Sequence, residues 1–567
     1  MKILGLIGRS DVEECHDAAA TLIDDGRIVW ALEQERLSRR RHAYGEGPGD
    51  VAEKCLQQME LTIDEIDFIA YGWIDEGVSQ QFGHTQHIRV SQDLARAILP
   101  VHLLVNRKSI PVHLVKHHYA HAASCFYTSG FDSAAIMVID GQGENESVSL
   151  YHAERANLGL LESYDICYSL GLFYEAAAHY CGLGWDAGGK LMGLAAFGRP
   201  TLCFEYEFDS STGRFTLPKM ILDRIRRGDV QAYDSPGIIR LWLDYFAEHC
   251  YPYRLGDGHD ILYYCDFAAS AQATLERIAL ALARRLKQLC GAADLALSGG
   301  CALNGKMNAR LCTERLFNRV YAFPAAHDAG TSLGAALALH VALTREAPGG
   351  EAVRRVDLGC AFGDSDIEHL LTDQGLCFEK FSSDELAKRV ADDLFDGRVV
   401  GWFRGRDEFG PRALGQRSFL GNPARRDLLH CLNEIKGREY WRPLAPSVLA
   451  EYVPYIFEEP VEPGLDRFML RVSTVRAPWR HRIPAVVHCD HTSRLHIVER
   501  GASDAAYHAL IEAFQRKSGI PLICNTSFNI AGQPLAHTPT DALDIFQRTG
   551  GVQVLVVGDY YVRKPVD

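Results

Sequence analysis

The sequence FDSAAIMVIDGQG, residues 131–143, decides the fold class of this chain. Residues 134–139 form a continuous apolar run, which is typical of a strand buried on both faces of a sheet. Asp140 and Gly141 end this run, and functional loops often follow the C-terminal ends of such strands. Residues 295–300 repeat the pattern, with a short apolar run followed by Ser298-Gly299-Gly300. Both segments predict buried strands that lead into glycine-rich loops.

Outward from these segments, apolar strand patterns alternate with helical patterns, which predicts an α/β fold. A hairpin is expected in residues 18–34, because Asp25-Gly26 separates two apolar runs. Residues 268–289 have the pattern of a long helix. The chain has 567 residues, too many for one ordinary core, and residues 343–358 are polar and rich in turn formers. We therefore expect two domains, 1–355 and 356–567.

The composition excludes some classes of protein. Lys and Arg number 59 against 73 Asp and Glu, so the formal charge of −14 disfavours a nucleic-acid partner. The 16 cysteines are scattered without a CxxC pair, which indicates a reduced, cytoplasmic protein. No uninterrupted apolar run approaches the ~18 residues of a membrane span, and the N-terminus lacks signal-peptide features. We expect neither a membrane nor a nucleic acid as partner.

His117 and His121 lie four residues apart, just before an apolar helical stretch. On a helix this spacing places both imidazoles on one face, where they can reach one metal ion. Asp140, at the strand end, and Asp328, at a loop-to-helix junction, would complete a His2Asp2 set. Nitrogen and oxygen donors together suit Fe(II), Mn(II) or Zn(II) better than Mg(II) or Ca(II). The spacing alone equally fits surface or core histidines.

Two glycine-rich loops follow the predicted strands, at 140–143 and 298–304. Glycine lets the backbone approach a phosphate closely, and a helix N-terminus attracts anions. Neither loop is a Walker motif, and turn glycines have many other uses. As a pair, however, they resemble the phosphate loops of the kinase, chaperone and actin superfamily.

The second half of the chain concentrates cations beside Gly and Pro. They are Arg404, Arg406, Arg412, Arg417, Lys436, Arg438 and Arg442. Arg binds phosphate and carboxylate groups through paired hydrogen bonds, so an anion site is expected. Asn525, Ser527 and Asn529 add neutral hydrogen-bonding groups after a predicted buried strand. A salt-bridged surface is the alternative, but these arginines alternate with Gly and Phe and not with Glu.

Nine segments, in order along nearly the whole chain, resemble the O-carbamoyltransferase family, whose members act on nodulation factors, cephamycins and aminoglycosides. The segments are CHDAAATLIDDGRIVWALEQERLSRRRH (15–42), KHHYAHAASCFYTSGFDSAAIMVIDGQGE (116–144), GGKLMGLAAFG (188–198), LSGGCALNGKMNARL (297–311), PAAHDAGTSLGAA (324–336), RGRDEFGPRALGQRSFLGNP (404–423), LNEIKGREYWRPLAPSVL (432–449), VVHCDHTSRLHIV (486–498) and PLICNTSFNIAGQPLAHTPTDAL (521–543).

The resemblance implies an actin-like N-terminal domain, related to O-sialoglycoprotein-endopeptidase-like proteins, and a YrdC-like α/β C-terminal domain. It implies that carbamoyl phosphate and ATP, with Mg(II), give carbamoyl-adenylate in the second domain. The carbamoyl group then passes to a hydroxyl of a small-molecule natural product, such as a sugar or polyketide in antibiotic biosynthesis. A homodimer is the assembly considered.

The resemblance also implies roles for individual residues. His117, His121, Asp140 and Asp328 would bind Fe(II) or a similar divalent metal, and His16 is a candidate general base. Lys436, Arg442, Arg494 and Ser527 match the adenylate-forming site. The candidate cofactor-binding residues are Gly141, Gly143, Lys190, Gly193, Gly299, Gly300, Asn304, Arg404, Arg412, Arg417, Asn525, Ser527 and Asn529.

Some positions depart from the family pattern. His491 stands where glycine is usual, His496 where Gln is usual, Gln533 where Glu is usual and Arg41 where Lys is usual. None of these is a candidate site residue, but the loop around His491 is expected to differ in shape.

Three other functions fit the sequence less well than carbamoyl transfer to a small molecule. A kinase or chaperone-like ATPase would leave the Arg-rich second half unexplained. Carbamoyl transfer to a protein or tRNA would need an additional zinc-finger or acylphosphatase-like module or a basic docking face, for which the sequence gives no sign. A non-catalytic relative is disfavoured because all four metal-ligand positions are intact.

The acceptor itself is not specified by the sequence. Residues 200–262 match the family poorly and are rich in aromatic and charged side chains. We expect this insertion to face the acceptor pocket together with His16, with Trp242 and Tyr245 contacting the acceptor through burial and stacking. The alternative is an ordinary insertion with its own small core.

Overall fold

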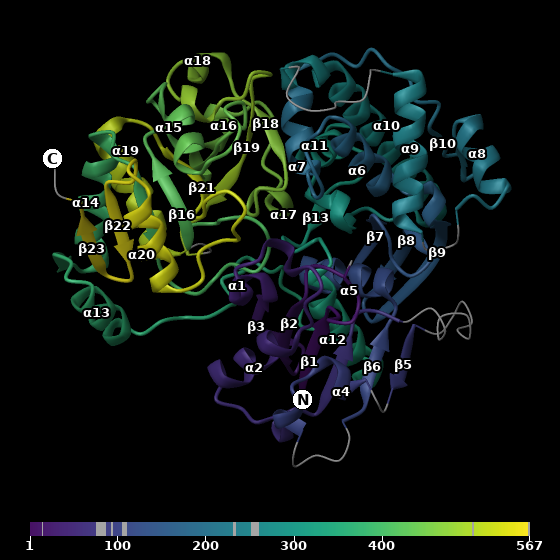
Figure 1. The fold of residues 1–567 in the computed structure, drawn as a ribbon, viewed down its shortest axis with the longest axis horizontal. Coiled ribbons are helices and arrows are strands. Elements are labelled where there is room, and N and C mark those ends of the chain that lie inside the picture. Colours follow the sequence, from purple (N-terminus) through teal and green to yellow (C-terminus); the bar gives the residue numbers. More distant parts are fainter. Residues whose placement is uncertain are drawn as a thin grey trace.

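The computed structural model describes residues 1–13, 15–74, 87–91, 94–104, 110–230, 234–250, 260–501 and 504–564. Figure 1 shows the N-terminal unit as two lobes, with the C-terminal unit, in green to yellow, beside them. Each lobe and the C-terminal unit contains its own sheet. Among the described residues, no helix has both the length and the hydropathy that crossing a membrane requires.

The first sheet has the strand order β3-β2-β1-β4-β6-β5. Its strands are β1 (Lys2–Ile7), β2 (Ala19–Asp24), β3 (Arg27–Glu33), β4 (Phe68–Tyr71), β5 (Ile88–Ser91) and β6 (Val112–Val115). Strands β1, β2 and β3 form an antiparallel meander, and β4 and β6 continue the sheet parallel to β1. The hairpin expected in residues 18–34 is β2–β3, with Asp25-Gly26 in its turn.

The second sheet repeats this topology, with the order β9-β8-β7-β12-β13. Its strands are β7 (Ser133–Ile139), β8 (Glu146–Glu154), β9 (Asn157–Asp165), β12 (Leu295–Ser298) and β13 (Val320–Ala322). Again three strands form an antiparallel meander and two more run parallel to the first. The α/β class is confirmed, and the duplicated topology agrees with the actin-like fold expected for this half.

Two buried helices, α5 (His117–Ser129) and α12 (Ala329–Thr344), lie between these sheets (Figure 1). Helix α12 packs on β1 and β2, α5 packs on β7 and β12, and the two helices pack on each other. Gly334 permits this close contact, because a Cβ there would overlap the carbonyl oxygen of Ala120. The packing brings the first turn of α5 close to the first turn of α12.

The remaining N-terminal elements surround the sheets. They are α1 (Gln34–Ser38), α2 (Gly49–Gln58), α4 (Ala95–Ile98), α6 (Leu170–Tyr180), α7 (Gly188–Leu194), β10 (Glu207–Asp209), β11 (Arg214–Thr216), α8 (Lys219–Arg226), α9 (Ser235–His249), α10 (Cys265–Cys290) and α11 (Gly305–Thr313). Helix α10 is the long helix expected at 268–289.

The insertion at 200–262 has an aromatic core, although residues 231–233 and 251–259 lie outside the described residues. Trp242 is 1% exposed and Tyr245 is 4% exposed. The Trp242 ring packs edge-on against Phe173 of α6, at 4.8 Å between centroids. The expectation that Trp242 and Tyr245 contact the acceptor is therefore wrong, because these rings fill the contact between α6 and α9.

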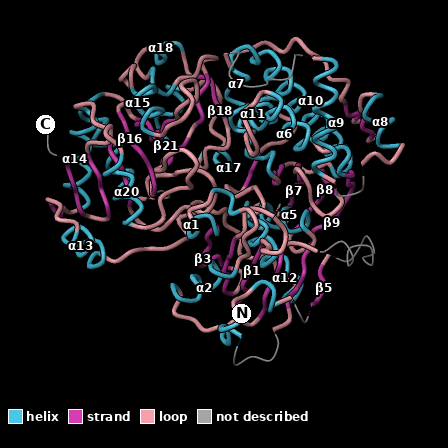
Figure 2. Tube along the Cα trace, viewed as in Figure 1, coloured by secondary structure: helices cyan, strands magenta, loops and turns pink. Residues whose placement is uncertain are grey.

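The C-terminal unit is built on an eight-stranded mixed sheet, β14-β23-β22-β15-β16-β21-β17-β20. Figure 2 shows its strands, in magenta, between helices, in cyan. Its elements are α13 (Asp364–Asp373), β14 (Phe378–Lys380), α14 (Ser383–Phe395), β15 (Val400–Phe403), β16 (Arg417–Gly421), α15 (Leu428–Ile435), β17 (Ala445–Leu449), α16 (Val453–Ile456), α17 (Pro463–Asp466), β18 (Val472–Thr474), α18 (Ala477–Arg480), β19 (Thr492–Arg494), β20 (His496–Val498), α19 (Ala505–Ser518), β21 (Leu522–Ser527), α20 (Pro539–Arg548), β22 (Val554–Val557) and β23 (Tyr560–Arg563).

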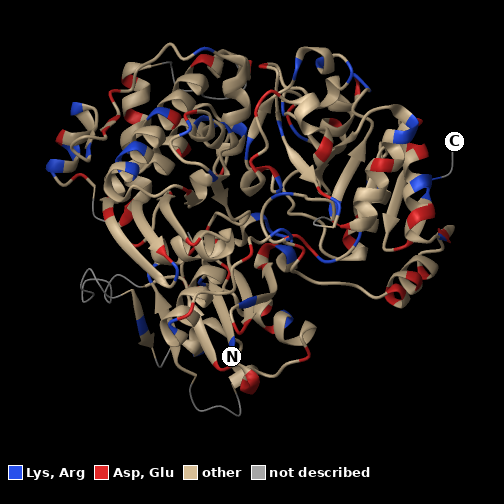
Figure 3. Ribbon diagram, turned by 180° about the vertical axis from the view of Figure 1, so that it is seen from behind, with Lys and Arg blue, Asp and Glu red and all other residues tan. Residues whose placement is uncertain are grey.

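Buried polar contacts join the two units. Arg36 of α1 is 1% exposed and donates a 2.8 Å hydrogen bond to the carbonyl oxygen of Gly410. The amide of Gly410 donates in turn to Glu33 at 2.7 Å. Lys306 of the N-terminal unit and Asp490 of the C-terminal unit form a partly exposed ion pair at 2.7 Å. Figure 3 shows Lys and Arg, in blue, along the seam between the units.

Candidate metal centre and anion site

The four predicted metal ligands come together at the contact between α5 and α12. His117 and His121 project from the first two turns of α5, Asp140 follows β7, and Asp328 immediately precedes α12. One ligand atom from each of the four lies within 4.8 Å of the others. His121 Nε2 is 3.0 Å from Asp140 Oδ2, and His117 Nε2 is 3.4 Å from Asp328 Oδ1. This set can hold a divalent metal.

Neighbouring groups orient these side chains. His117 Nδ1 lies 3.1 Å from the carbonyl oxygen of Gly72, and His121 Nδ1 lies 3.1 Å from Ser298 Oγ. Each contact leaves Nε2 directed at the cluster, as second-shell partners do for metal-binding histidines. Asp140 Oδ1 accepts hydrogen bonds from the amides of Gly141 and Gly300, both at 2.9 Å. Both glycine-rich loops therefore hold Asp140, with Oδ2 facing the histidines.

The electrostatics of the cluster fit a bound cation. Asp140 Oδ2 is buried without a hydrogen bond of ordinary geometry, and the Nε2 atoms of His117 and His121 are only 3.0 Å apart. Burial opposes the charged form of His117, but the carboxylates of Asp328 and Asp140 outweigh it and raise its pKa. Burial likewise opposes the charge of Asp140, yet both histidines hold its pKa well below the usual range. A divalent ion would take the place of the proton that His117 attracts.

One cavity of about 1490 Å³ lies between the two units. Asp140, Asp328 and His16 are on its N-terminal wall, and Lys436 and Arg494 are on its C-terminal wall. The other candidate residues on the wall are Gly141, Lys190, Gly300, Asn304, Arg412, Arg442, Asn525, Ser527 and Asn529. The structure thus places the candidate metal centre and the candidate anion site on one continuous space.

Lys436 is the most buried cation of this wall, at 4% exposed. Its Nζ donates to Ser527 Oγ at 3.1 Å, to Asn529 Oδ1 at 2.6 Å and to the carbonyl oxygens of both residues. Burial lowers its pKa well below the ordinary value, and the charges of Arg438 and Arg442 add to that effect. Its partners here are neutral oxygens.

The arginines around Lys436 carry the same sign of charge. Burial lowers the pKa of Arg494 to about 10 and of Arg438 to about 9, and Arg442 contributes to both shifts. The Nε atoms of Arg412 and Arg494 are buried and have no hydrogen-bond partner within the described part of the chain. The carboxylate of Glu439 offsets part of this charge. It is shared between Lys190, at 3.0 Å, and Arg442, at 3.6 Å. An anionic ligand would satisfy this excess of positive charge.

Several sequence candidates lie off the cavity wall. Arg404 pairs with Asp559 at 2.8 Å, and Arg417 is buried beside Asp407 at 3.2 Å. Gly143 and Gly299 shape the loops: the amide of Gly143 donates to Glu146 O at 2.7 Å, and Gly299 has φ +86°. The carbonyl oxygen of Gly193 lies 3.0 Å from His488 Nε2.

A second group of possible ligand atoms, Cys360, Asp407 and His537, is also close together. Arg417 already places a positive charge 3.2 Å from Asp407 there, and His537 Nδ1 lies 3.0 Å from the same carboxylate. This group is better described as a buried ion pair.

The structure shows the surroundings of two residues that depart from the family pattern, His491 and His496. His491 has φ +65°, a left-handed conformation that favours glycine, so its position suits the residue that is usual there. His496 is 4% exposed and its Nδ1 lies 2.7 Å from Ser447 Oγ, away from the cavity wall.

Sequence reasoning missed Asp17, which joins His16 to a second histidine. His16 Nδ1 lies 3.0 Å from Asp17 Oδ2, and His42 Nδ1 lies 2.9 Å from Asp17 Oδ1. All three residues line the cavity. The adjacency of His16 and Asp17 was visible in the sequence, but the approach of His42 depends on the fold.

The insertion lines the cavity, but with other residues than the sequence suggested. Ser235, Pro236 and Ile239, in the first turns of α9, are on the wall, whereas Trp242 and Tyr245 pack into the core behind it. Trp185 also lines the cavity and is 56% exposed.

We expect the purified protein to bind about one divalent metal ion per chain, and His117→Ala or Asp328→Ala to weaken binding by more than the ~100-fold typical of outer-shell losses. His118→Gln is the matched control, because His118 is an adjacent buried imidazole that contacts Ser149 at 2.7 Å and is not among the four ligands. Metal content after dialysis measures the effect. Equal retention in all three variants would refute this metal site.

Comparisons with known proteins give the family of this chain. The family models described as "Carbamoyltransferase N-terminus" and "Carbamoyltransferase C-terminus" match residues 8–337 and 391–564. The chain is 34% identical to "Nodulation protein NolNO" of Sinorhizobium fredii, over 97% of this chain and 79% of that protein. It is 30% identical to "Nodulation protein U" of the same organism, over 91% of this chain and 93% of that protein.

Solved structures overlap with this one only loosely. Full-length HypF in its phosphate- and nucleotide-bound form gives a TM-score of 0.34 at 14% identity, over 60% of this chain and 46% of that chain. An uncharacterized protein of Synechocystis, by contrast, is 31% identical over 97% of this chain and 95% of its own length. Two family models match this chain, and its relatives align along nearly its whole length. The chain therefore belongs to the carbamoyltransferase family of transferases.

Proposed function

We propose that this carbamoyltransferase makes carbamoyl-adenylate from ATP and carbamoyl phosphate at the cationic wall of the cavity. It then transfers the carbamoyl group to a small-molecule hydroxyl at the metal centre. The observation that carries the proposal is one cavity that is lined by a group of cations from the C-terminal unit and by the two carboxylates of the His2Asp2 set. Each wall suits one half of such a reaction.

The cationic wall suits the first step, because both substrates are phosphorylated anions. In a balanced sequence, water releases phosphate from carbamoyl phosphate, and an oxygen of the resulting carbamate attacks the α-phosphorus of ATP and displaces pyrophosphate. Negative charge develops at that phosphorus and on the leaving pyrophosphate. Lys436, Arg442 and Arg494 are fixed by the fold before reaction, so they can stabilise this charge without reorganising.

The metal wall suits the second step. A bound divalent ion would supply Lewis acidity toward the carbamoyl oxygen. His16 is on the same wall, where it can take the proton of the acceptor hydroxyl. AMP leaves as the bond from the hydroxyl oxygen to the carbamoyl carbon forms. We propose that Trp185 and the first turns of α9 contact the acceptor, a natural product such as a sugar or polyketide.

The shared cavity also explains how a labile mixed anhydride could survive. Transfer within one shared cavity would shorten the exposure of the intermediate to bulk water, which would hydrolyse it. ATP enters this scheme with Mg(II), while Fe(II) or a similar ion is proposed for the His2Asp2 set. A cytoplasmic location and a homodimer remain predictions from the sequence.

Alanine at Lys436 or Arg494 should slow ATP- and carbamoyl-phosphate-dependent pyrophosphate release by about a hundredfold to a thousandfold. That is the ~3–4 kcal/mol lost when one preorganised charge-stabilising group is removed. Synthetic carbamoyl-adenylate should restore product formation in these variants, because it bypasses the impaired step. His117→Ala should behave oppositely, with pyrophosphate release retained and transfer lost.

Arg480→Ala provides a control for a lost surface arginine, because Arg480 has a side-chain exposure of 31% and lies beside Glu458 at 3.8 Å, off the cavity wall. If carbamoyl-adenylate did not rescue folded Lys436→Ala protein, or if His117→Ala stopped pyrophosphate release as strongly as transfer, the two-site proposal would fail.

The transfer step should depend on pH through His16. Burial disfavours the charged imidazole, but the hydrogen bond and charge of Asp17 outweigh it and raise its pKa above the ordinary value. A general base must be unprotonated, so transfer should speed up as pH rises through this raised pKa. Asp17→Asn removes the carboxylate and should move the midpoint to lower pH by about one to three units.

Single-turnover transfer from synthetic carbamoyl-adenylate, measured across pH, isolates this step from adenylation. Asp11→Asn is the charge control, because Asp11 is an exposed carboxylate paired with Arg9 in the same loop region. An Asp17→Asn profile that superimposes on that of the unmodified protein would remove His16 from the role of base.

A further inference from the structure

We propose that Glu144 is a positioning residue of the metal centre: its carboxylate fixes the start of α5 against the loop after β4, and thereby places His117. The inference rests on the proposed metal centre and adds a residue that is not one of its ligands. Glu144 is the last residue of the segment IDGQGE (139–144). Asp140, Gly141 and Gly143 of this segment are candidate site residues from the sequence.

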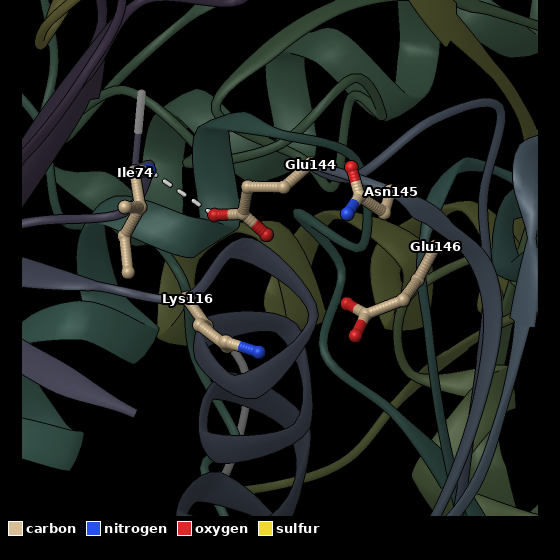
Figure 4. Close-up of a pocket in the computed structure, with 5 residues that line it drawn as sticks. All are labelled: Ile74, Lys116, Glu144, Asn145 and Glu146. Atoms are coloured by element: carbon tan, nitrogen blue, oxygen red, sulfur yellow. Dashed lines mark hydrogen bonds between the residues drawn. The ribbon is translucent and has the colours of Figure 1, made fainter. Parts of the chain in front are cut away.

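Glu144 makes three hydrogen bonds to backbone amides. Its Oε1 accepts from the amide of His117 at 2.9 Å and from the amide of Ile74 at 3.1 Å, and its Oε2 lies 3.2 Å from the amide of His117. Figure 4 shows the carboxylate directed toward Ile74 from the loop that also carries Asn145 and leads into β8 at Glu146. The side chain is buried, with the whole residue 5% exposed.

The first of these bonds serves a helix that lacks an ordinary cap. The first amides of any helix have no partner within the helix, and a neighbouring side chain usually supplies one. Lys116 stands at the cap position of α5 and makes no side-chain capping bond. Glu144 supplies the missing acceptor from another segment.

The bond to Ile74 connects this helix start to the group that orients the His117 ring. Ile74 lies two residues after Gly72, whose carbonyl oxygen is 3.1 Å from His117 Nδ1. Glu144 itself lies four residues after the ligand Asp140. One carboxylate therefore ties together the backbone of His117, the segment that orients its ring and the loop that carries Asp140.

Both oxygens of the Glu144 carboxyl group act as acceptors at this position. An ionised carboxylate accepts hydrogen bonds at both oxygens, whereas the amide of Gln presents an acceptor and a donor. In Glu144→Gln the NH2 group would face a backbone N–H, or the side chain would turn and lose one of its contacts. The change preserves size and removes charge, so it tests the hydrogen bonds with little change in packing.

We expect Glu144→Gln to raise the dissociation constant for Co(II) by about 10-fold to 100-fold, the range typical of outer-shell partners. The visible absorption of bound Co(II) should also change, because His117 would be displaced. Glu146→Gln is the matched control, since it removes a second carboxylate from the small pocket that Glu144 lines. Thermal unfolding of each apoprotein shows whether the variants remain folded.

Unchanged affinity and spectrum in folded Glu144→Gln would overturn this inference and leave the metal centre intact. Equal weakening in Glu146→Gln would overturn it as well, since local charge would then be the cause. If Glu144→Gln did not fold, Glu144→Asp, which keeps two acceptor oxygens on a shorter side chain, should still bind Co(II) more weakly than the unmodified protein, and normal binding would refute the idea. If the unmodified protein bound no Co(II), the proposed metal centre would fail first.

Discussion

The docking of the two units through buried Arg36 is the contact on which the site depends. Arg36 belongs to the N-terminal unit, yet it donates to the carbonyl oxygen of Gly410, while the Gly410 amide donates to Glu33. Removing one member of such a buried network leaves an uncompensated charge, which typically costs about 3–5 kcal/mol. Because Pro411 and Arg412 follow Gly410 and line the cavity, the same contact sets the position of the cationic wall.

The cavity closed by this contact has unlike walls. On the N-terminal side, carboxylates and histidines surround the α5–α12 contact, where Gly334 lets the helices approach. On the C-terminal side, Lys436 and its neighbouring arginines have mainly neutral partners. In the proposed reaction, an anion formed at the second wall would reach the first through this shared cavity. The two walls therefore suit the two steps of the proposed reaction.

Local sequence patterns predicted the elements that have a continuous apolar run, a turn dipeptide or a clear helical periodicity. Residues 134–139 are within β7, Asp25-Gly26 turns the β2–β3 hairpin, and residues 268–289 are within α10. The i, i+4 spacing brought His117 and His121 together, but the position of Asp328 depends on helix packing that no spacing reveals. The sequence offered Asp328 as a candidate only through its place at a loop-to-helix junction, and the family resemblance supported that choice.

The failures have a common physical origin. Aromatic density at 200–262 could not separate a core from a binding surface, so Trp242 and Tyr245 were misplaced. Arginine density did not distinguish Arg417, which balances Asp407, from Arg442, which lines the cavity. Glu144 and Asp17 were missed because their partners, Ile74 and His42, are distant in sequence.

The central claim is that carbamoyl-adenylate passes between the walls inside one molecule. It is tested most directly by supplying isotopically labelled carbamoyl phosphate and ATP together with an excess of unlabelled carbamoyl-adenylate, and measuring label in the carbamoylated product. Internal passage predicts product that keeps most of its label despite the unlabelled pool. Label diluted in proportion to that pool would show that the intermediate is released, and would contradict the account.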